Sequence, residues 1–225
     1  MRETKSYEDY FKYYGPSNIK YRFFRKIIKK YKQSGNLLDV GCAHGYFLKI
    51  VKKDFNCEGL EYNRSATKIA RQITKCKIYN ESIENAKKIK SNKYDIITCF
   101  DVLEHTTRPD IAISEIGRLL KKGGLVIISV PNTNSLGHKL KGKDWFGYMD
   151  KTHKSILSNE DWVRLFNKNK LKVIDVFYDG YFDIPYNRFP LILQKVYLIP
   201  GIFQYVTGIK IIPKNGENIL YILKK

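Results

Sequence analysis

The sequence predicts an α/β protein built on a doubly wound, mostly parallel sheet. Seven short apolar runs are separated by stretches with helical periodicity, and such alternation gives parallel strands joined by right-handed crossovers. Several runs are apolar almost throughout, as strands covered on both faces require. The expected strands are residues 36–41, 57–62, 76–80, 94–100, 124–130, 171–178 and 218–224.

Three of the connecting helices have recognisable ends. Asn63 can cap a helix over residues 64–73, in which apolar side chains recur on one face. Pro109 suits the first turn of a helix over residues 110–122, and the glycine pair at 123–124 would end it. The third helix is expected after a capping box formed by Ser158 and Asp161.

The composition indicates which kinds of partner the chain could attract, but it does not identify a ligand. The chain has 41 Lys+Arg against 22 Asp+Glu, and its formal net charge of +19 can attract RNA, phosphorylated metabolites or acidic lipid headgroups. The lysines are spread through nearly every segment, so a solvated lysine-rich surface is the favoured interpretation. The 4 cysteines contain no Cys-x-x-Cys pair, and reduced structural thiols are expected. The polar N-terminus does not resemble a signal peptide, which predicts a cytoplasmic protein.

The segment from Asp39 to Gly45 combines a carboxylate with a turn of small residues. It reads Asp-Val-Gly-Cys-Ala-His-Gly and leads from an expected strand into a helical stretch. Small residues let backbone amides approach a ligand closely. Dinucleotide folds use Gly-x-Gly-x-x-Gly and normally lack an acid just before it. Asp39 would repel a pyrophosphate but would attract a ligand that carries an ammonium and a sulfonium group.

On these residues the chain resembles the class I S-adenosylmethionine-dependent methyltransferases, in particular the ubiquinone- and menaquinone-biosynthesis branch and the methyltransferase-domain families around it. The stretch "LLDVGCAHGYFL" matches the family's first motif, Asp-x-Gly-x-Gly-x-Gly, with Ala43 at the position of the middle glycine. The stretches "GLEYN", "NESIE" and "FDVLEH" follow at the family's spacing, up to the Pro-Asn near residue 132. The resemblance implies a Rossmann-like sheet of seven strands with the last strand antiparallel.

The resemblance also implies a binding site for S-adenosyl-L-methionine. Glu61, at the end of the second strand, would hold both ribose hydroxyls, and Tyr62 would lie along the adenine. The residues after the third strand would meet the adenine, although Glu81 or Ser82 could instead begin a helix. The full set expected to contact the cofactor is Asp39, Gly41, Ala43, Gly45, Glu61, Tyr62, Glu81, Ser82, Ile83 and Phe100.

We expect a single methyltransferase domain over residues 1–225, because the chain is long enough for one substantial core. Long insertions in compact domains are usually functional. The expected parts are an N-terminal helical cap (1–35), a cofactor-binding core (36–131), a substrate or lid insertion (132–157) and a C-terminal part (158–225) with an apolar lid segment (188–213).

Two histidines are candidates for a general base, which a hydroxyl acceptor usually needs near neutral pH. His105 follows the fourth strand, where it could instead shape the pocket, and His153 lies in the long insertion, where it could instead form loop hydrogen bonds. His44 and His138 are not candidates. No clear carboxylate trio is present, so no metal site is expected, although Asp101 and Glu104 are close enough in sequence to leave a metal-assisted reaction open.

The acceptor is only partly constrained. The motif [Asn/Asp]-Pro-Pro-aromatic is absent after the fourth strand, which disfavours nucleobase amines. The insertion combines Trp145, Phe146, Tyr148 and Met149 with nearby lysines, and this mixture suits a sugar, a quinone-like ring or a phosphorylated or lipid-linked acceptor, and also stacked bases. Segment 188–213 is expected to cover the sheet or to make peripheral contact with a membrane. The leading hypothesis is O-methylation of a small-molecule, glycan or lipid-linked acceptor, and the alternatives are RNA modification and cofactor binding without turnover.

Overall fold

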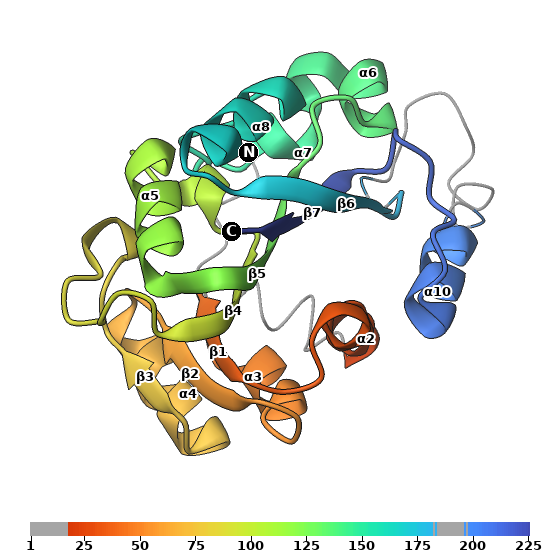
Figure 1. The fold of residues 1–225 in the computed structure, drawn as a ribbon. Coiled ribbons are helices and arrows are strands. Elements are labelled where there is room, and N and C mark those ends of the chain that lie inside the picture. Colours follow the sequence, from red (N-terminus) through yellow and green to blue (C-terminus); the bar gives the residue numbers. More distant parts are fainter. Residues whose placement is uncertain (1–17, 182, 184–195, 197) are drawn as a thin grey trace.

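The computed structural model describes residues 18–181, 183, 196 and 198–225, and it contains one seven-stranded sheet in the order β3-β2-β1-β4-β5-β7-β6 (Figure 1). The first five strands are mutually parallel, and β7 pairs antiparallel with both β5 and β6. The predicted doubly wound sheet with an antiparallel last strand is therefore confirmed. The strands are β1 (Asn36–Val40), β2 (Asn56–Leu60), β3 (Lys77–Tyr79), β4 (Tyr94–Phe100), β5 (Leu120–Pro131), β6 (Lys172–Asp179) and β7 (Asn218–Lys224).

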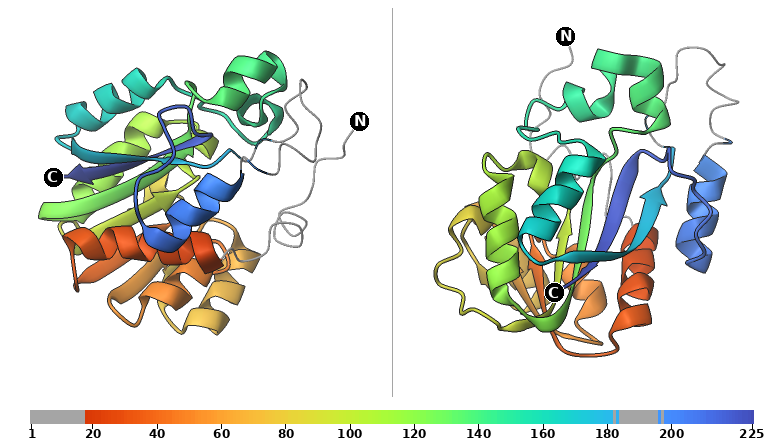
Figure 2. Two further views of the ribbon diagram at one scale, coloured as in Figure 1. Left: turned by 90° about the vertical axis from the view of Figure 1, so that its right-hand side faces the viewer. Right: turned by 45° about the horizontal axis from the view of Figure 1, so that its top comes forward.

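Helices cover both faces of the sheet (Figures 1 and 2). Those named α2, α3 and α4 lie on one face, and α5 and α8 lie on the other. The helices are α2 (Asn18–Tyr31), α3 (Tyr46–Val51), α4 (Arg64–Thr74), α5 (Pro109–Leu119), α6 (Leu136–Lys141), α7 (Phe146–Met149), α8 (Asn159–Lys168) and α10 (Leu198–Thr207), with short 3-10 helices η1 (Ile83–Asn85), η2 (Leu103–His105) and η3 (Gly142–Asp144).

Two of the predicted helix starts have the expected caps. The Asn63 side chain accepts hydrogen bonds from the amides of Ser65 and Ala66, and Ser158 accepts one from the amide of Asp161. The predicted end of α5 is wrong by three residues, because α5 stops at Leu119 rather than at the glycine pair. Leu120 is fully buried and already pairs with Tyr94 of β4, so burial in the sheet wins over helical propensity there.

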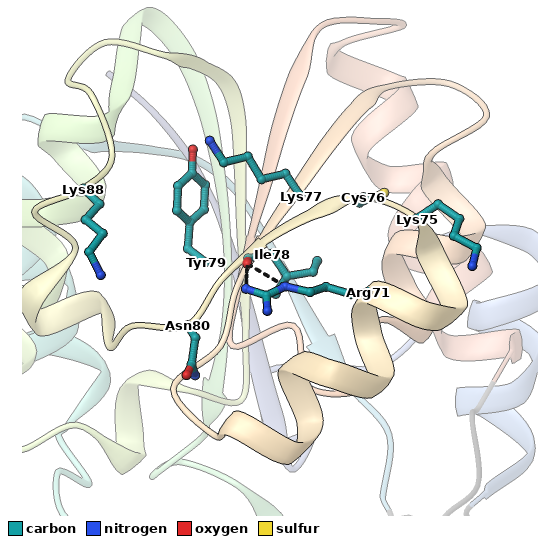
Figure 3. A pocket seen from close by; sticks show the side chains of 8 residues that line it. All are labelled: Arg71, Lys75, Cys76, Lys77, Ile78, Tyr79, Asn80 and Lys88. Carbon is teal, nitrogen blue, oxygen red and sulfur yellow. Dashed lines mark hydrogen bonds between the residues drawn. The ribbon is translucent and has the colours of Figure 1, made fainter.

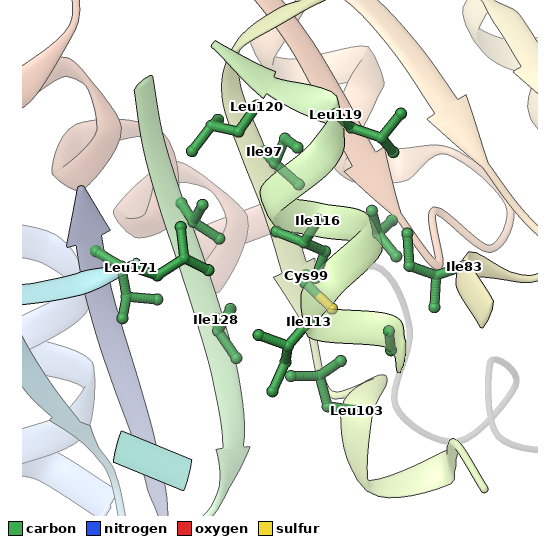
Figure 4. Packing of buried hydrophobic residues seen from close by; sticks show 14 of the residues in the cluster. Ile83, Ile97, Cys99, Leu103, Ile113, Ile116, Leu119, Leu120, Ile128 and Leu171 are labelled. Atoms are coloured by element: carbon green, nitrogen blue, oxygen red, sulfur yellow. The ribbon is translucent and has the colours of Figure 1, made fainter. Parts of the chain in front are cut away.

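The core consists of two clusters, one on each face of the sheet. Figure 4 shows the first cluster, where β4 and β5 pack against α5 through side chains such as Ile97, Ile113, Ile116 and Ile128. Cys99 lies fully buried among them, and all 4 cysteines are free thiols, as expected. The second cluster fills the space beneath α2 and α3.

The insertion after β5 folds into α6, η3 and α7 instead of an open loop. Trp145 is fully buried, and its indole N–H donates to Glu217 Oε2 at 3.2 Å. The hypothesis that Trp145 presents its ring to an acceptor is therefore wrong, because the ring is part of the core. Tyr148 and Met149 of the same insertion remain exposed.

Parts of two expected segments fall outside the described residues. Residues 1–17 of the expected cap and residues 188–195 and 197 of the expected lid segment belong to this group. None of the helices in the described ranges has the length and apolar character needed to cross a bilayer.

Candidate cofactor and acceptor site

The glycine turn between β1 and α3 depends on left-handed backbone conformations. Gly41, Ala43 and Gly45 have φ values of +69°, +48° and +79°. The amides of Gly41 and Cys42 both donate to the carbonyl oxygen of Leu60 at 2.8 and 3.1 Å, which ties the turn to the end of β2. Ala43 takes its left-handed conformation with a Cβ atom present, at a cost of about 1–2 kcal/mol.

Gly41→Ala is expected to lower the free energy of unfolding by about 2–4 kcal/mol, the sum of backbone strain and overpacking. An added Cβ would lie 2.3 Å from Cγ2 of Val102. Gly123→Ala is the matched control, because Gly123 has a φ of +73° but no atom within 4 Å of the added Cβ. Denaturant unfolding of both variants should show a clearly larger loss for Gly41→Ala, and equal losses would contradict the steric explanation.

Asp39 is a buried carboxyl group at the end of β1. It is 4% exposed, and its Oδ1 accepts a hydrogen bond from the Thr98 hydroxyl at 2.7 Å. Burial raises the pKa of Asp39 to about 7, with a further contribution from Glu61, although the Thr98 hydrogen bond opposes the rise. A cationic ligand beside Asp39 would favour the ionised form of this group.

Glu61 lies directly after β2, 2% exposed, beneath the glycine turn. Its Oε2 accepts from the amide of Ala43 at 3.0 Å, and its Oε1 accepts from the amide of Asn63 at 2.8 Å. Burial raises the pKa of Glu61, while these amide bonds lower it. Each carboxylate oxygen can accept a second hydrogen bond, so the group fits two ribose hydroxyls. Tyr62, next in the chain, is 70% exposed and available at the rim.

The affinity for S-adenosyl-L-methionine is expected to fall about tenfold between pH 8 and pH 6, because binding below pH 7 must remove a proton from Asp39. The stability of the folded protein without ligand depends on pH in the opposite direction, since it is higher at low pH. Its Asp39 pKa is raised, so the stability from the protonated group is complete below about pH 4 and is lost as the pH rises through 7. Calorimetric titrations in buffers of different ionisation enthalpy measure the affinity and the proton release, and Asp39→Asn should abolish the release.

The residues after β3 occupy several different environments. Ser82 caps η1 by accepting from the amide of Glu84, which is the alternative noted for it from the sequence. Ile83 is 4% exposed and belongs to the first core cluster. Glu81 forms an ion pair with Lys88 at 2.7 Å, while its buried Oε2 atom has no hydrogen-bond partner in the part of the chain that the structure describes. Contact of these three residues with adenine remains a prediction.

Phe100, at the end of β4, packs inward. Its ring stacks on Phe24 of α2 at a centroid distance of 4.1 Å and meets Phe47 edge-on at 5.1 Å. The residue after it, Asp101, has a φ of +55°. Strain of this kind at a strand end is typical of functional sites.

Asp101 belongs to a polar cluster that the sequence analysis missed. Its Oδ1 accepts from the Ser129 hydroxyl at 2.6 Å and from the Asn218 amide at 3.1 Å. Lys20 Nζ lies 3.0 Å from Asp179 and 3.6 Å from Asp101. Burial alone would lower the pKa of Lys20, but the two carboxylates outweigh it and hold the pKa well above its usual value. Polar residues at the ends of four neighbouring strands were the available signal, whereas nothing in the sequence of α2 indicated that Lys20 reaches them.

The two candidate bases meet in space. The rings of His105 and His153 lie 4.8 Å apart by centroid distance, although 47 residues lie between the two histidines in the chain. Burial, reinforced by the neighbouring His153, lowers the pKa of His105, which favours a neutral imidazole. His153 Nδ1 lies 2.7 Å from the carbonyl oxygen of Gly147. A carbonyl can only accept, so Nδ1 carries the proton and Nε2 of the neutral ring presents a lone pair.

Glu104 completes this group. It is 1% exposed, its Oε2 has no hydrogen-bond partner among the described residues, and burial raises its pKa well above the usual range. One ligand atom each from Glu104, His105 and His153 lies within 4.8 Å of the others, so the three could hold a divalent cation. The sequence analysis considered Asp101 with Glu104 instead, but Asp101 forms an ion pair with Lys20 and accepts from Ser129 and Asn218.

The described part of the chain also has two surface grooves whose linings do not include the predicted cofactor residues. The larger, of about 910 Å³, follows the edge strand β3 (Figure 3). Its cations include Arg71, whose guanidinium donates to the carbonyl oxygen of Ile78, and Lys77, which lies over the ring of Tyr79. The smaller, of about 540 Å³, is lined by asparagines, lysines, Tyr178 and Pro213.

The chain is similar in sequence to known methyltransferases. A family model described as Methyltransferase domain matches residues 12–176. The ubiquinone biosynthesis O-methyltransferase of Hydrogenovibrio crunogenus is 31% identical over 117 residues, which are 48% of this chain and 48% of that protein. The match thus spans about half the length of the curated relatives.

Two solved structures share the fold over nearly the whole chain. A SAM-dependent methyltransferase from Archaeoglobus fulgidus is similar with a TM-score of 0.70 and 20% identity, over 98% of this chain and 100% of the other. A possible histamine N-methyltransferase from Thermotoga maritima is similar with a TM-score of 0.71 and 17% identity, over 97% and 95%. The family model, the sheet topology and the two buried acids at the glycine turn agree, and the chain therefore belongs to the methyltransferase domain family, as a class I methyltransferase with S-adenosyl-L-methionine as its cofactor.

Proposed function

We propose that this protein transfers a methyl group to a hydroxyl oxygen of a small-molecule acceptor. The observation that carries the proposal is the pairing of His105 and His153 beside the buried Glu104, after the carboxyl end of β4. Ligands of open α/β sheets bind at the carboxyl ends of the strands. An imidazole that is neutral near pH 7 at such a position suits removal of a hydroxyl proton.

The reaction requires little covalent help from the protein. When bound, S-adenosyl-L-methionine supplies an electrophilic methyl group on a good leaving group. The acceptor oxygen would attack this methyl group in line, so that the oxygen–methyl bond would form as the sulfur–methyl bond breaks and the sulfur leaves as a neutral thioether. Alignment of the acceptor by the protein would supply much of the acceleration. We assign receipt of the hydroxyl proton to Nε2 of His153, with His105 as the neighbouring second candidate. Asp150 Oδ2, 3.7 Å from His153 Nε2, would stabilise the resulting imidazolium.

A metal-assisted form of the same reaction is the main mechanistic alternative. A divalent cation held by Glu104, His105 and His153 would lower the pKa of a bound acceptor hydroxyl and leave the histidines as ligands rather than bases. Dialysis against EDTA separates the two mechanisms, because only the metal-assisted reaction would be lost and then restored by adding a divalent cation.

The acceptor class rests on the names of relatives and on the site. The curated relatives act in ubiquinone biosynthesis as O-methyltransferases, which supports a small hydroxylated acceptor, and the exposed Tyr148 and Met149 leave a glycan or lipid-linked acceptor compatible with the insertion. RNA is the second candidate, because four cations, Arg71, Lys75, Lys77 and Lys88, border the groove along β3. Three of them already have partners, since Arg71 bonds to backbone, Lys77 lies over the ring of Tyr79 and Lys88 pairs with Glu81, so this observation gives RNA less support.

The test supplies radiolabelled S-adenosyl-L-methionine and extract separated into small-metabolite, glycan, lipid and RNA fractions. We expect label in a small hydroxylated metabolite, and mass spectrometry should identify a methyl ether. Label in RNA that disappears after nuclease treatment would replace the proposal with the second candidate. Cofactor binding by calorimetry without label in any fraction would favour the third hypothesis, a protein that binds the cofactor without turnover.

A further inference from the structure

Helix α10 has an inverted distribution of polar and apolar side chains. Its buried side carries Gln204, which donates to the carbonyl oxygen of Tyr178 at 2.8 Å and accepts from the amides of Ile211 and Ile212 at 2.9 and 3.1 Å. A helix at a protein surface normally turns its apolar residues inward and its polar residues outward. Here the polar anchor faces inward and fixes the orientation of the helix.

The outward side of α10 is an apolar ridge, formed by Ile199, Ile202, Phe203 and Val206. These side chains are 59%, 51%, 53% and 56% exposed, and they follow one another at the spacing of one helix face. Ile209, just beyond the helix, is a further 59% exposed. Single exposed apolar residues are ordinary, but a continuous ridge marks an interaction surface. The expectation that this segment covers the sheet is therefore only partly met, because one side of the helix is left uncovered.

A basic row lies beside the ridge on α2, formed by Arg22, Lys26 and Lys30. Figure 2 shows α2 and α10 next to each other, and Lys26 Nζ donates to the carbonyl oxygen of Val206. The sequence of α2 contains no acidic residue. None of the three cations forms an ion pair within the described part of the chain, whereas Arg25 and Lys29 of the same helix pair with Asp54.

We propose that the apolar ridge and the basic row together bind the surface of a bilayer that contains anionic lipids. An apolar helix side lying in the interface and cations at headgroup level are the two components of peripheral membrane binding. The net charge of +19 adds long-range attraction to the same surface.

A second copy of the chain fits this face less well than a bilayer. A twofold contact places the same patch of both copies against itself, so two basic rows would be brought close together. Asp54 and Asp175 both contact residues of α2, but Asp54 already pairs with Arg25 and Lys29, and Asp175 pairs with Lys210 and accepts from Tyr31. An anionic lipid surface would supply the negative charge that balances the basic row.

The proposed membrane face is continuous with the site. Tyr205 of α10 donates to Asp179, and Lys20 of α2 lies 3.0 Å from the same carboxylate, so both helices that form the face also border the polar cluster. Binding would place the strand ends close to the headgroups, where an acceptor embedded in the bilayer could be reached. The inference goes beyond methyl transfer, and it can fail without affecting the proposed function.

The test is sedimentation of the full chain with vesicles, without cofactor or acceptor. The parent protein is expected to bind vesicles of phosphatidylcholine with about one third phosphatidylglycerol at least about ten times more strongly than pure phosphatidylcholine, with weaker binding as salt rises. Ile202→Glu/Phe203→Glu should reduce binding about tenfold or more. Leu140→Glu is the matched control, since Leu140 is an apolar residue 44% exposed on α6, and it should leave binding within about twofold of the parent.

A direct readout of insertion uses Phe203→Trp. The two native tryptophans are buried, at 0% and 1% exposure, so a blue shift that appears only in this variant on adding anionic vesicles would report entry of the ridge into the interface. Absence of vesicle binding by the parent would overturn the proposal, and so would equal binding by the double variant. A dimer in size-exclusion chromatography that Ile202→Glu/Phe203→Glu dissociates would also overturn it, in favour of self-association.

Discussion

Glu61→Ala is expected to weaken the binding of S-adenosyl-L-methionine by about a hundredfold or more, because two charge-assisted hydrogen bonds to the ribose are lost together. In the structure each oxygen of Glu61 accepts one backbone amide and has capacity for one hydroxyl. Asp39→Ala should cause a comparable loss, because it removes the buried carboxyl group that would face the cationic end of the cofactor. Calorimetric titration with S-adenosyl-L-methionine measures both effects.

The controls separate ligand contact from damage to the turn. Glu61→Ala also removes the acceptor for the amide of Ala43, so its unfolding free energy must be measured alongside its affinity. Glu58→Gln is the matched control, because Glu58 lies in β2, shortly before Glu61 along the chain, but accepts from Lys93 and Tyr94 instead of from the glycine turn. This change should leave the affinity for S-adenosyl-L-methionine within about twofold of the parent. If Asp39→Ala and Glu61→Ala, both folded, bind like the parent, the cofactor site is assigned to the wrong residues.

His153→Ala is expected to lower kcat by a factor of about 10² to 10⁴, the usual range for loss of a general base, while the affinity for S-adenosyl-L-methionine stays unchanged. The side chain is held by the carbonyl oxygen of Gly147 and lies against His105, so its Nε2 has a fixed direction. Single-turnover methyl transfer to the acceptor, once identified, measures the chemical step, and calorimetry measures the affinity.

The matched control is a histidine of the same insertion. His138 Nδ1 lies 2.6 Å from the carbonyl oxygen of Thr133, and its ring packs on Trp145, away from Glu104 and His105. His138→Gln should therefore leave kcat within about threefold of the parent. Unchanged turnover in His153→Ala would remove this residue from the reaction, and equal losses in both variants would point to general damage of the insertion.

The sequence could identify the two acids of the cofactor site more completely than the two histidines. Asp39 was identified by the glycine turn that follows it, and Glu61 by the resemblance to the methyltransferase family, while the structure shows that their strands are neighbours in the sheet. His105 and His153 could be named only as separate candidates. Their contact depends on how the insertion folds back over η2, where the amides of Lys154 and Ser155 donate to the carbonyl oxygen of Glu104.

Other features were decided by packing between distant segments. Trp145 lies in an aromatic and basic stretch that suggested contact with an acceptor. In the structure its ring is buried instead, because it packs over Gly147 and its indole N–H donates to the carboxylate of Glu217. Lys20 is one of many lysines, and only the docking of α2 places it between Asp101 and Asp179. The exposed side of α10 is likewise set by Gln204, whose partners come from β6 and from the segment after the helix.

The sequence by itself determined the seven strands, their doubly wound arrangement and the glycine turn after Asp39, because these follow from short-range patterns and from the chirality of crossover connections, and the role of Glu61 came from the family resemblance. The tertiary structure alone decided the pairing of the two histidines with Glu104, the buried lysine between two carboxylates and the apolar ridge beside the basic row. Those features arise from contacts between residues far apart in the chain, and no local pattern encodes which distant side chain fills a given space.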